Sequence, residues 1–170
     1  MYSQTEQQHD CVSDKGIFWG YASVFNRVDQ QKDIIAPGSF AESLKRRKVA
    51  LLWQHNTKDP IGKILSLTEN SFGLLMTAQL NLDLLKGREV YSMIKKGIIN
   101  SLSIGYRVVT SRRDKRSRIR IITKIDLWEV SLVTFPANDR ATISNIKGGQ
   151  PSEPDMKNFD LAPPPERRSF

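Results

Sequence analysis

Two short segments near the middle of the chain carry the residue types that nucleophilic hydrolysis needs. Residues 51–55 read Leu-Leu-Trp-Gln-His, an apolar run that ends in one of only two histidines. Residues 101–106 read Ser-Leu-Ser-Ile-Gly-Tyr and follow a segment with helical periodicity. A serine hydroxyl becomes a strong nucleophile when a neighbouring histidine accepts its proton. Ser103 and His55 are therefore a candidate nucleophile and general base, provided that the fold brings them together.

Each of these residues also has a structural interpretation. Ser103 could be a strand serine that faces solvent, with Gly105 marking a β-bulge; alternatively, the glycine frees space on the serine's own face for a substrate backbone. His55 could be an inert, hydrogen-bonded residue at a strand end, although its ordinary pKa near 6.5 suits a base at neutral pH. His9 lies in a polar stretch and is a poor competitor.

A catalytic triad needs a third group that orients the imidazole and stabilises its cation. Glu129 and Asp126 are the candidates, both in or beside a β-type segment. In an unbroken strand, residues three apart point to opposite faces, so only one of the two can face the site. Glu129 is the more conspicuous, because its neighbours are apolar. Its alternative role is a structural ion pair with Arg107 or Arg120.

The charge of the chain allows a second class of function. The 170 residues favour one domain with an ordinary core, but 26 Lys and Arg against 18 Asp and Glu give a net charge of +8. Basic runs at 45–48 and 112–118 could contact the phosphates of a nucleic acid. The second run has no interleaved aromatic residues for base stacking, so a solvated hairpin turn is its simpler interpretation.

Metal and cofactor chemistry has little support in the sequence. One cysteine, Cys11, and two histidines do not make a zinc cluster, and the glycines lack phosphate-loop or dinucleotide spacing. The single cysteine allows no disulfide within the chain, which suits a reducing compartment. No apolar run has the length of a transmembrane helix, and residues 1–14 lack the apolar core of a signal peptide. We therefore expect neither metal nor cofactor.

The elements that must position these residues are mostly strands. Aromatic and β-branched runs predict strands at 16–25, 33–35, 49–53, 61–68, 72–80, 102–109, 119–125 and 127–133. The Asp-Pro pair at 59–60 predicts an interruption of the regular structure. Helical patterns predict one helix capped by Ser39 and another over 82–96 that stops at Gly97. Consecutive strands outnumber helix-separated ones, which predicts an α+β domain built on an antiparallel sheet or barrel with helices outside it.

Composition divides the chain into three parts. Residues 1–15 are polar and predict a disordered arm, and residues 147–170 are rich in proline, glycine and charge and predict a disordered tail. Residues 16–146 form the predicted domain. The exposed arm and tail are also candidate sites of self-processing.

Several short motifs, taken together, resemble the prohead serine proteases of tailed phages. They include Gly-Tyr-Ala-Ser-Val-Phe at 20–25, Pro-Gly-Ser-Phe at 37–40, Leu-Leu-Trp-Gln-His at 51–55, Ser-Ile-Gly-Tyr at 103–106 and Glu-Val-Ser-Leu-Val at 129–133. The resemblance covers about 16–146. It implies an assemblin-like fold, in which a largely antiparallel, closed β-barrel of about seven strands is surrounded by helices.

The same resemblance implies a function and a site. It implies a serine endopeptidase that acts inside the prohead, in the host cytoplasm. Its substrates would be the internal scaffold, or the scaffold-like N-terminal segment of the major capsid protein, and the protease itself. His55, Ser103 and Glu129 match the family's catalytic positions, with Asp126 as the alternative third member. Backbone N–H groups of 135–140 are the expected oxyanion donors, and a homodimer or higher homo-oligomer is expected.

The competing hypotheses are not enzymatic. One is a basic β domain that binds nucleic acid through runs 45–48 and 112–118, and another is a capsid-assembly factor whose site is vestigial. The first predicts salt-sensitive nucleic-acid binding, and both predict indifference to substitution of Ser103.

Overall fold

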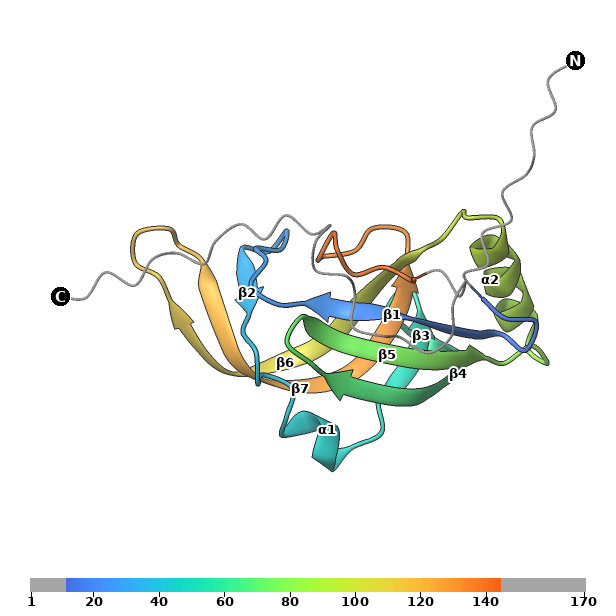
Figure 1. Ribbon diagram of the computed structural model, residues 1–170, viewed down its shortest axis with the longest axis horizontal. Helices are drawn as coiled ribbons and strands as arrows, with labels where there is room; N and C mark the ends of the chain where they lie inside the picture. Colours follow the sequence, from blue (N-terminus) through green and yellow to red (C-terminus); the bar gives the residue numbers. More distant parts are fainter. Residues whose placement is uncertain (1–11, 145–170) are drawn as a thin grey trace, which may run out of the picture.

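Runs of β-branched and aromatic residues account for most of the regular structure in the computed structural model, which describes residues 12–144 (Figure 1). Its elements are, in chain order, β1 (Ile17–Val24), β2 (Asp33–Ile35), α1 (Ser43–Arg46), β3 (Ala50–Trp53), β4 (Asn56–Glu69), β5 (Gly73–Leu80), α2 (Leu85–Lys95), β6 (Ser101–Arg113) and β7 (Arg120–Val133). The predicted α+β class, dominated by strands, is confirmed.

All seven strands belong to one sheet, in the order β1-β5-β4-β3-β7-β2, with β6 on the other edge of β7. Four pairs are antiparallel, namely β1–β5, β4–β5, β3–β4 and β6–β7. β7 also pairs in parallel with both β2 and β3. The largely antiparallel sheet is therefore as predicted, and β7 joins the segments that carry the candidate site residues.

The sheet curls into a half-barrel, so the predicted closed barrel is wrong (Figure 1). β1 and β6 do not pair with each other, because residues 141–144 lie between them. This segment makes isolated bridges, from Ile143 to Gly20 and from Thr142 to Ser101. Gly20 is required there, because a Cβ at this position would overlap the backbone oxygen of Thr142.

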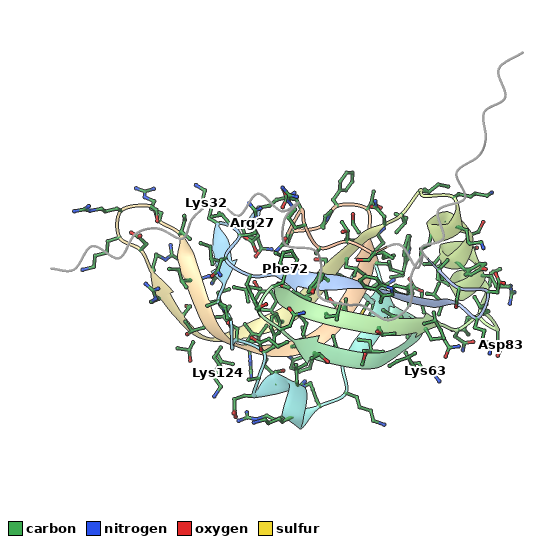
Figure 2. The ribbon with its side chains drawn as sticks, viewed as in Figure 1. Arg27, Lys32, Lys63, Phe72, Asp83 and Lys124 are labelled. Carbon is green, nitrogen blue, oxygen red and sulfur yellow. The ribbon has the colours of Figure 1, made fainter. Side chains whose placement is uncertain are left out.

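The hydrophobic core lies within the curl of the sheet. Its fully buried side chains include Phe18, Phe40, Leu51, Ile61, Leu74, Met76, Leu102, Ile122 and Leu127. Charged side chains such as Lys63 and Asp83 project from the surface (Figure 2). No helix in the described part of the chain is long and apolar enough to cross a membrane.

The two helices are shorter than predicted. α1 has four residues and begins after Glu42, so Ser39 is not its cap; the buried Ser39 hydroxyl donates instead to the carbonyl oxygens of Ala36 and Ile122. α2 ends as predicted at Gly97, whose φ is 66°; Gly97 N–H donates to Ile94 and Ile98 N–H to Met93. The ring of helices around the sheet stays a prediction.

The largest differences from the predicted strand boundaries are in β4 and β7. β4 continues through Asp59 and Pro60, because Pro60 lies at an irregularity of the β3–β4 ladder, where a missing N–H is tolerated. β7 runs unbroken where two strands were predicted.

At the N-terminus, Val12 is already buried in the core, within the predicted 1–15 arm. Residues 1–11, with Cys11, and the predicted tail at 147–170 lie outside the described residues.

Candidate active site

His55 occupies a tight turn that fixes its position. Trp53 pairs with Asn56, so Gln54 and His55 are the two loop residues of the β3–β4 hairpin. Their φ angles of 51° and 59° are both positive, as a type I′ turn requires. Gln54 anchors the turn to the end of β7, donating its N–H to the Leu132 carbonyl at 3.0 Å and its Nε2 to Thr134 Oγ1 at 2.8 Å. The imidazole is therefore held against β7.

The imidazole of His55 is bound to Glu129. Nδ1 of His55 lies 2.6 Å from Oε1 of Glu129. The carboxylate is largely buried, with 11% of the Glu129 side chain exposed, whereas 44% of the His55 side chain is exposed. The carboxylate of this pair is therefore buried and the imidazole is accessible. In a catalytic triad, a buried carboxylate orients an accessible imidazole in the same way.

Ser131 completes this network, and the sequence analysis did not identify it. Its hydroxyl donates to Oε2 of Glu129 at 2.6 Å and accepts the backbone N–H of His55 at 3.0 Å. Ser131 is 0% exposed. Because Glu129 and Ser131 are two residues apart in β7, they share one face of the strand. That spacing was visible in the sequence and was the signal that could have found Ser131.

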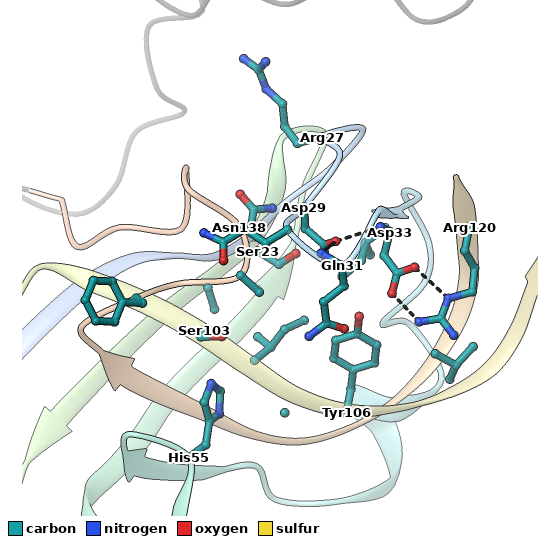
Figure 3. A pocket seen from close by; sticks show the side chains of 18 residues that line it. Ser23, Arg27, Asp29, Gln31, Asp33, His55, Ser103, Tyr106, Arg120 and Asn138 are labelled. Atoms are coloured by element: carbon teal, nitrogen blue, oxygen red, sulfur yellow. Dashed lines mark hydrogen bonds and ion pairs between the residues drawn. The ribbon is translucent and has the colours of Figure 1, made fainter. Parts of the chain in front are cut away.

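Ser103 lies directly across the β6–β7 ladder from Ser131, and Gly105 lies across from Glu129. Directly opposed residues of an antiparallel pair point to the same face. Ser103 and His55 accordingly line one cavity of about 480 Å³ (Figure 3). Because Nδ1 faces Glu129, Nε2 is the nitrogen of His55 left for Ser103. No hydrogen bond joins the two side chains in the described structure, and such bonds often tighten only when substrate binds.

Gly105 has a different role from the one that the sequence suggested. A Cβ on Gly105 would overlap Oε1 and the carboxyl carbon of Glu129. The space that the glycine leaves is therefore filled by the carboxylate on its way to His55. The β-bulge considered for this position is also present, as a register shift between Gly105 and Tyr106.

Asp126, the alternative third residue, faces other partners. Its Oδ2 lies 3.2 Å from Arg47 and 3.5 Å from Arg107. Arg120 pairs instead with Asp33. The two arginines considered as partners for Glu129 therefore bind other carboxylates, and the acid that contacts His55 is Glu129.

The electrostatics of the pair suit a general base. The hydrogen bond that Nδ1 donates to the Glu129 carboxylate raises the pKa of His55 above its ordinary value of 6.5, while partial burial opposes this rise. The same bond places the Nδ1 proton toward the carboxylate and leaves Nε2 to accept a proton.

Of the other candidates, the expected oxyanion segment lies at the same cavity, whereas the two basic runs lie elsewhere in the fold. Phe135, Ala137 and Asn138, from the segment expected to supply oxyanion donors, line it. The basic run 112–118 spans the tip of the β6–β7 hairpin, and 45–48 lies at the end of α1 and beyond. Within residues 12–144, no group of three or more His, Cys, Asp and Glu side chains could hold a metal ion.

A buried serine and an accessible imidazole that line one cavity, with a buried carboxylate bound to the imidazole, are the groups that a serine hydrolase uses. The family model for the caudovirus prohead serine proteases matches residues 3–156. The chain belongs to this family.

Individual relatives agree with this membership. The chain is 36% identical over 150 residues to the prohead protease of Enterobacteria phage HK97, a match that covers 86% of the chain and 67% of that protein. Among solved structures, the capsid assembly protease of bacteriophage T4 is similar with a TM-score of 0.59 and 15% identity, over 70% of this chain and 81% of that one. KSHV protease, solved with a hexapeptide phosphonate inhibitor, is similar with a TM-score of 0.53 and 12% identity, over 75% and 63%. The expected likeness of fold to herpesvirus proteases is thus confirmed.

Proposed function

We propose that this chain is a serine endopeptidase of capsid maturation in which Ser103 is the nucleophile, His55 the general base and Glu129 the residue that orients His55. The single observation that supports this most strongly is the continuous network from Ser131 through Glu129 to His55, which leaves the second imidazole nitrogen facing the cavity that Ser103 lines.

In the proposed mechanism, Ser103 Oγ attacks the carbonyl carbon of the scissile peptide bond while Nε2 of His55 takes its proton. The imidazolium then gives that proton to the leaving amine, and an acyl-enzyme remains on Ser103. A water molecule, deprotonated by His55, attacks the ester carbonyl; the bond from the acyl carbon to Ser103 Oγ then breaks, the imidazolium returns the proton to Oγ, and the acid product leaves. Glu129 stabilises the imidazolium at both stages, and backbone N–H groups of 135–140 are the proposed oxyanion donors.

The substrate is proposed to bind along β6. In the described residues, β6 pairs with β7 on one edge, and on the other edge Leu102 N–H donates to Ala141. Ile104, Gly105 and Tyr106 follow along the cavity. An extended peptide could add to this edge through main-chain hydrogen bonds, with its scissile bond at Ser103.

We propose that the natural substrates are the internal scaffold, or the scaffold-like N-terminal segment of the major capsid protein, cut inside the prohead in the host cell. Self-cleavage within 1–15 or 147–170, and a homodimer or higher homo-oligomer, belong to the same proposal. Membership of the prohead protease family supports the capsid context.

Co-production with the major capsid protein tests this function. The wild-type chain should yield a shortened capsid protein with one new N-terminus, identified by N-terminal sequencing, and Ser103→Ala should yield only the full-length form. Intact masses of the two purified proteases would show whether self-cleavage depends on Ser103. Equal processing by both proteins would contradict the proposal, and salt-sensitive nucleic-acid binding without processing would favour the basic β domain instead.

A further inference from the structure

A second serine in the cavity is buried and lacks a hydrogen-bond partner. Ser23, on β1, is 1% exposed, and its Oγ has no partner in the described structure. Yet Ser23 lines the same cavity as Ser103 and His55 (Figure 3). A buried hydroxyl without a partner is uncommon in folded proteins and calls for an explanation, because its desolvation is not compensated. A substrate group that fills the cavity would supply the missing partner.

Two carboxylates, Asp29 and Asp33, line the same cavity as Ser23, and they have different partners. Arg120 binds both carboxylate oxygens of Asp33, so this pair is internally neutralised. The Asp29 carboxylate receives only backbone N–H groups, those of Gln31 and Asp33, both on Oδ1. Oδ2 of Asp29 has no bond within the described residues. Asp29 thus makes no side-chain ion pair within the described residues, although the positive charge of Arg120 opposes the rise of its pKa.

The other cation of the cavity lining points elsewhere. Figure 3 shows the side chain of Arg27 extending away from Tyr106 and Asp33, whereas Tyr106 directs its hydroxyl toward the Asp33 end of the cavity. The half-buried hydroxyl of Tyr106, the buried hydroxyl of Ser23 and the Asp29 carboxylate, which has no side-chain ion pair in the described residues, together suit a group that carries positive charge and several hydrogen-bond donors.

We propose that Ser23, Asp29 and Tyr106 form a specificity subsite that binds a lysine or arginine side chain of the substrate close to the scissile bond. This inference rests on the proposed proteolytic function. A bound ammonium or guanidinium group would pair with Asp29 and donate to the hydroxyls of Ser23 and Tyr106. The subsite would thus select basic residues through the carboxylate and penalise shorter apolar ones, which leave the polar groups buried without partners.

The acid–base properties of the lining agree with this assignment. Burial, together with the negative charges of Asp33 and Asp29 and against the opposing effect of Arg120, raises the pKa of Tyr106 to about 12. Burial also raises the pKa of Asp29 above its ordinary value. Burial is the main cause of both shifts, and a basic substrate side chain bound beside these groups would oppose both of them.

Cleavage-site profiling tests the proposal. A peptide library made from a proteome with a glutamate-specific protease retains internal lysines and arginines, and cleavage by the full chain is read by mass spectrometry against Ser103→Ala. The wild type should show Lys or Arg enriched at one fixed position near the cleaved bond. Asp29→Asn keeps the Oδ1 acceptor for the loop but removes the charge, and should reduce this enrichment about tenfold or more.

Ser23→Ala separates a binding role from a structural one. Because the hydroxyl has no partner in the substrate-free protein, its removal should leave the melting temperature unchanged or higher, while kcat/KM for lysine-containing peptides falls about tenfold. The matched control is Ser39→Ala, because Ser39 is equally buried but its hydroxyl has two acceptors. Ser39→Ala should lower the melting temperature and leave the residue preference unchanged.

Three outcomes are decisive. A basic preference that weakens in Asp29→Asn and Ser23→Ala supports the subsite. Cleavage that depends on Ser103 but shows no basic preference, or a preference that both variants retain, overturns the subsite while the proteolytic function stands. The absence of any cleavage that depends on Ser103 contradicts the proteolytic function, and the subsite falls with it.

Discussion

Gly105 faces Glu129 across the β6–β7 ladder, and the carboxylate of Glu129 occupies the space that a side chain on Gly105 would take. The glycine is two residues from Ser103 in the same strand. One short segment of β6 therefore both carries the proposed nucleophile and leaves room for the carboxylate that binds His55.

The first prediction concerns this close approach. Gly105→Ala should displace the Glu129 carboxylate from His55, because a side chain can move where a backbone cannot. Cleavage should fall about a hundredfold, since small displacements of catalytic groups are costly, while the fold survives. The matched control is Gly62→Ala, whose Cβ would overlap the backbone oxygen of Gln79. That variant should lose about 1–3 kcal/mol of unfolding free energy by chemical denaturation. Full activity in Gly105→Ala would contradict this account.

The second prediction separates the two acidic candidates. Glu129→Gln keeps the shape of the side chain but removes the charge that stabilises the imidazolium, so the cleavage rate should fall about a hundredfold or more. Asp126→Asn is the control, because Asp126 binds Arg47 and Arg107 rather than His55. Its cleavage rate should stay within about twofold of wild type, because Asp126 does not belong to the network that orients the imidazole. The reverse ranking of the two variants would identify Asp126 as the third residue.

The third prediction concerns Ser131, the residue that the sequence analysis missed. Ser131→Ala removes one bond to Glu129 and one to the His55 backbone, and leaves both groups without this partner. Unfolding free energy should fall by about 1–3 kcal/mol, because Ser131 is fully buried. The cleavage rate should fall as well, because the carboxylate loses its support. Unchanged stability would show that the network is not formed in solution.

The fourth prediction concerns pH. Since Glu129 raises the pKa of His55 above 6.5, the acid limb of the cleavage profile should have its midpoint above 6.5, and Glu129→Gln should move that midpoint down. The stabilisation from the charged pair is fully present below pH 6.5 and is lost as pH rises through the folded-state pKa. The melting-temperature advantage of wild type over Glu129→Gln should therefore shrink as the pH rises above 6.5. NMR titration of His55 in a Ser103→Ala background gives the pKa directly; a value at or below 6.5 would be inconsistent with the pair.

Much of the fold could be predicted from local patterns. The strand runs, the hairpin between β4 and β5 and the stop at Gly97 depend on residues close in sequence, and local chemistry decides them. Sheet closure depends on how β1, β6 and the segment 141–144 meet, which no local pattern specifies. Pro60 was misread for a related reason, because only the register with β3 shows that it lies at an irregularity.

The site was predictable by residue type but not by geometry. His55, Ser103 and Glu129 were chosen for their chemistry and their match to a family, and their contacts could not be read from spacing. The type I′ turn at Gln54 and His55 carries no glycine, so the sequence gives no turn signal there. The role of Gly105 was misassigned, because the residue that needs its space comes from another strand.

Covalent labelling of Ser103 tests the central claim most directly. The full-length wild-type chain is incubated with a fluorophosphonate at neutral pH, and the adduct is located by mass spectrometry, with His55→Ala and Ser103→Ala treated in parallel. The account predicts a single adduct on Ser103, much slower labelling in His55→Ala and none in Ser103→Ala. An adduct on another serine, or labelling of Ser103 at the same rate without His55, would contradict it.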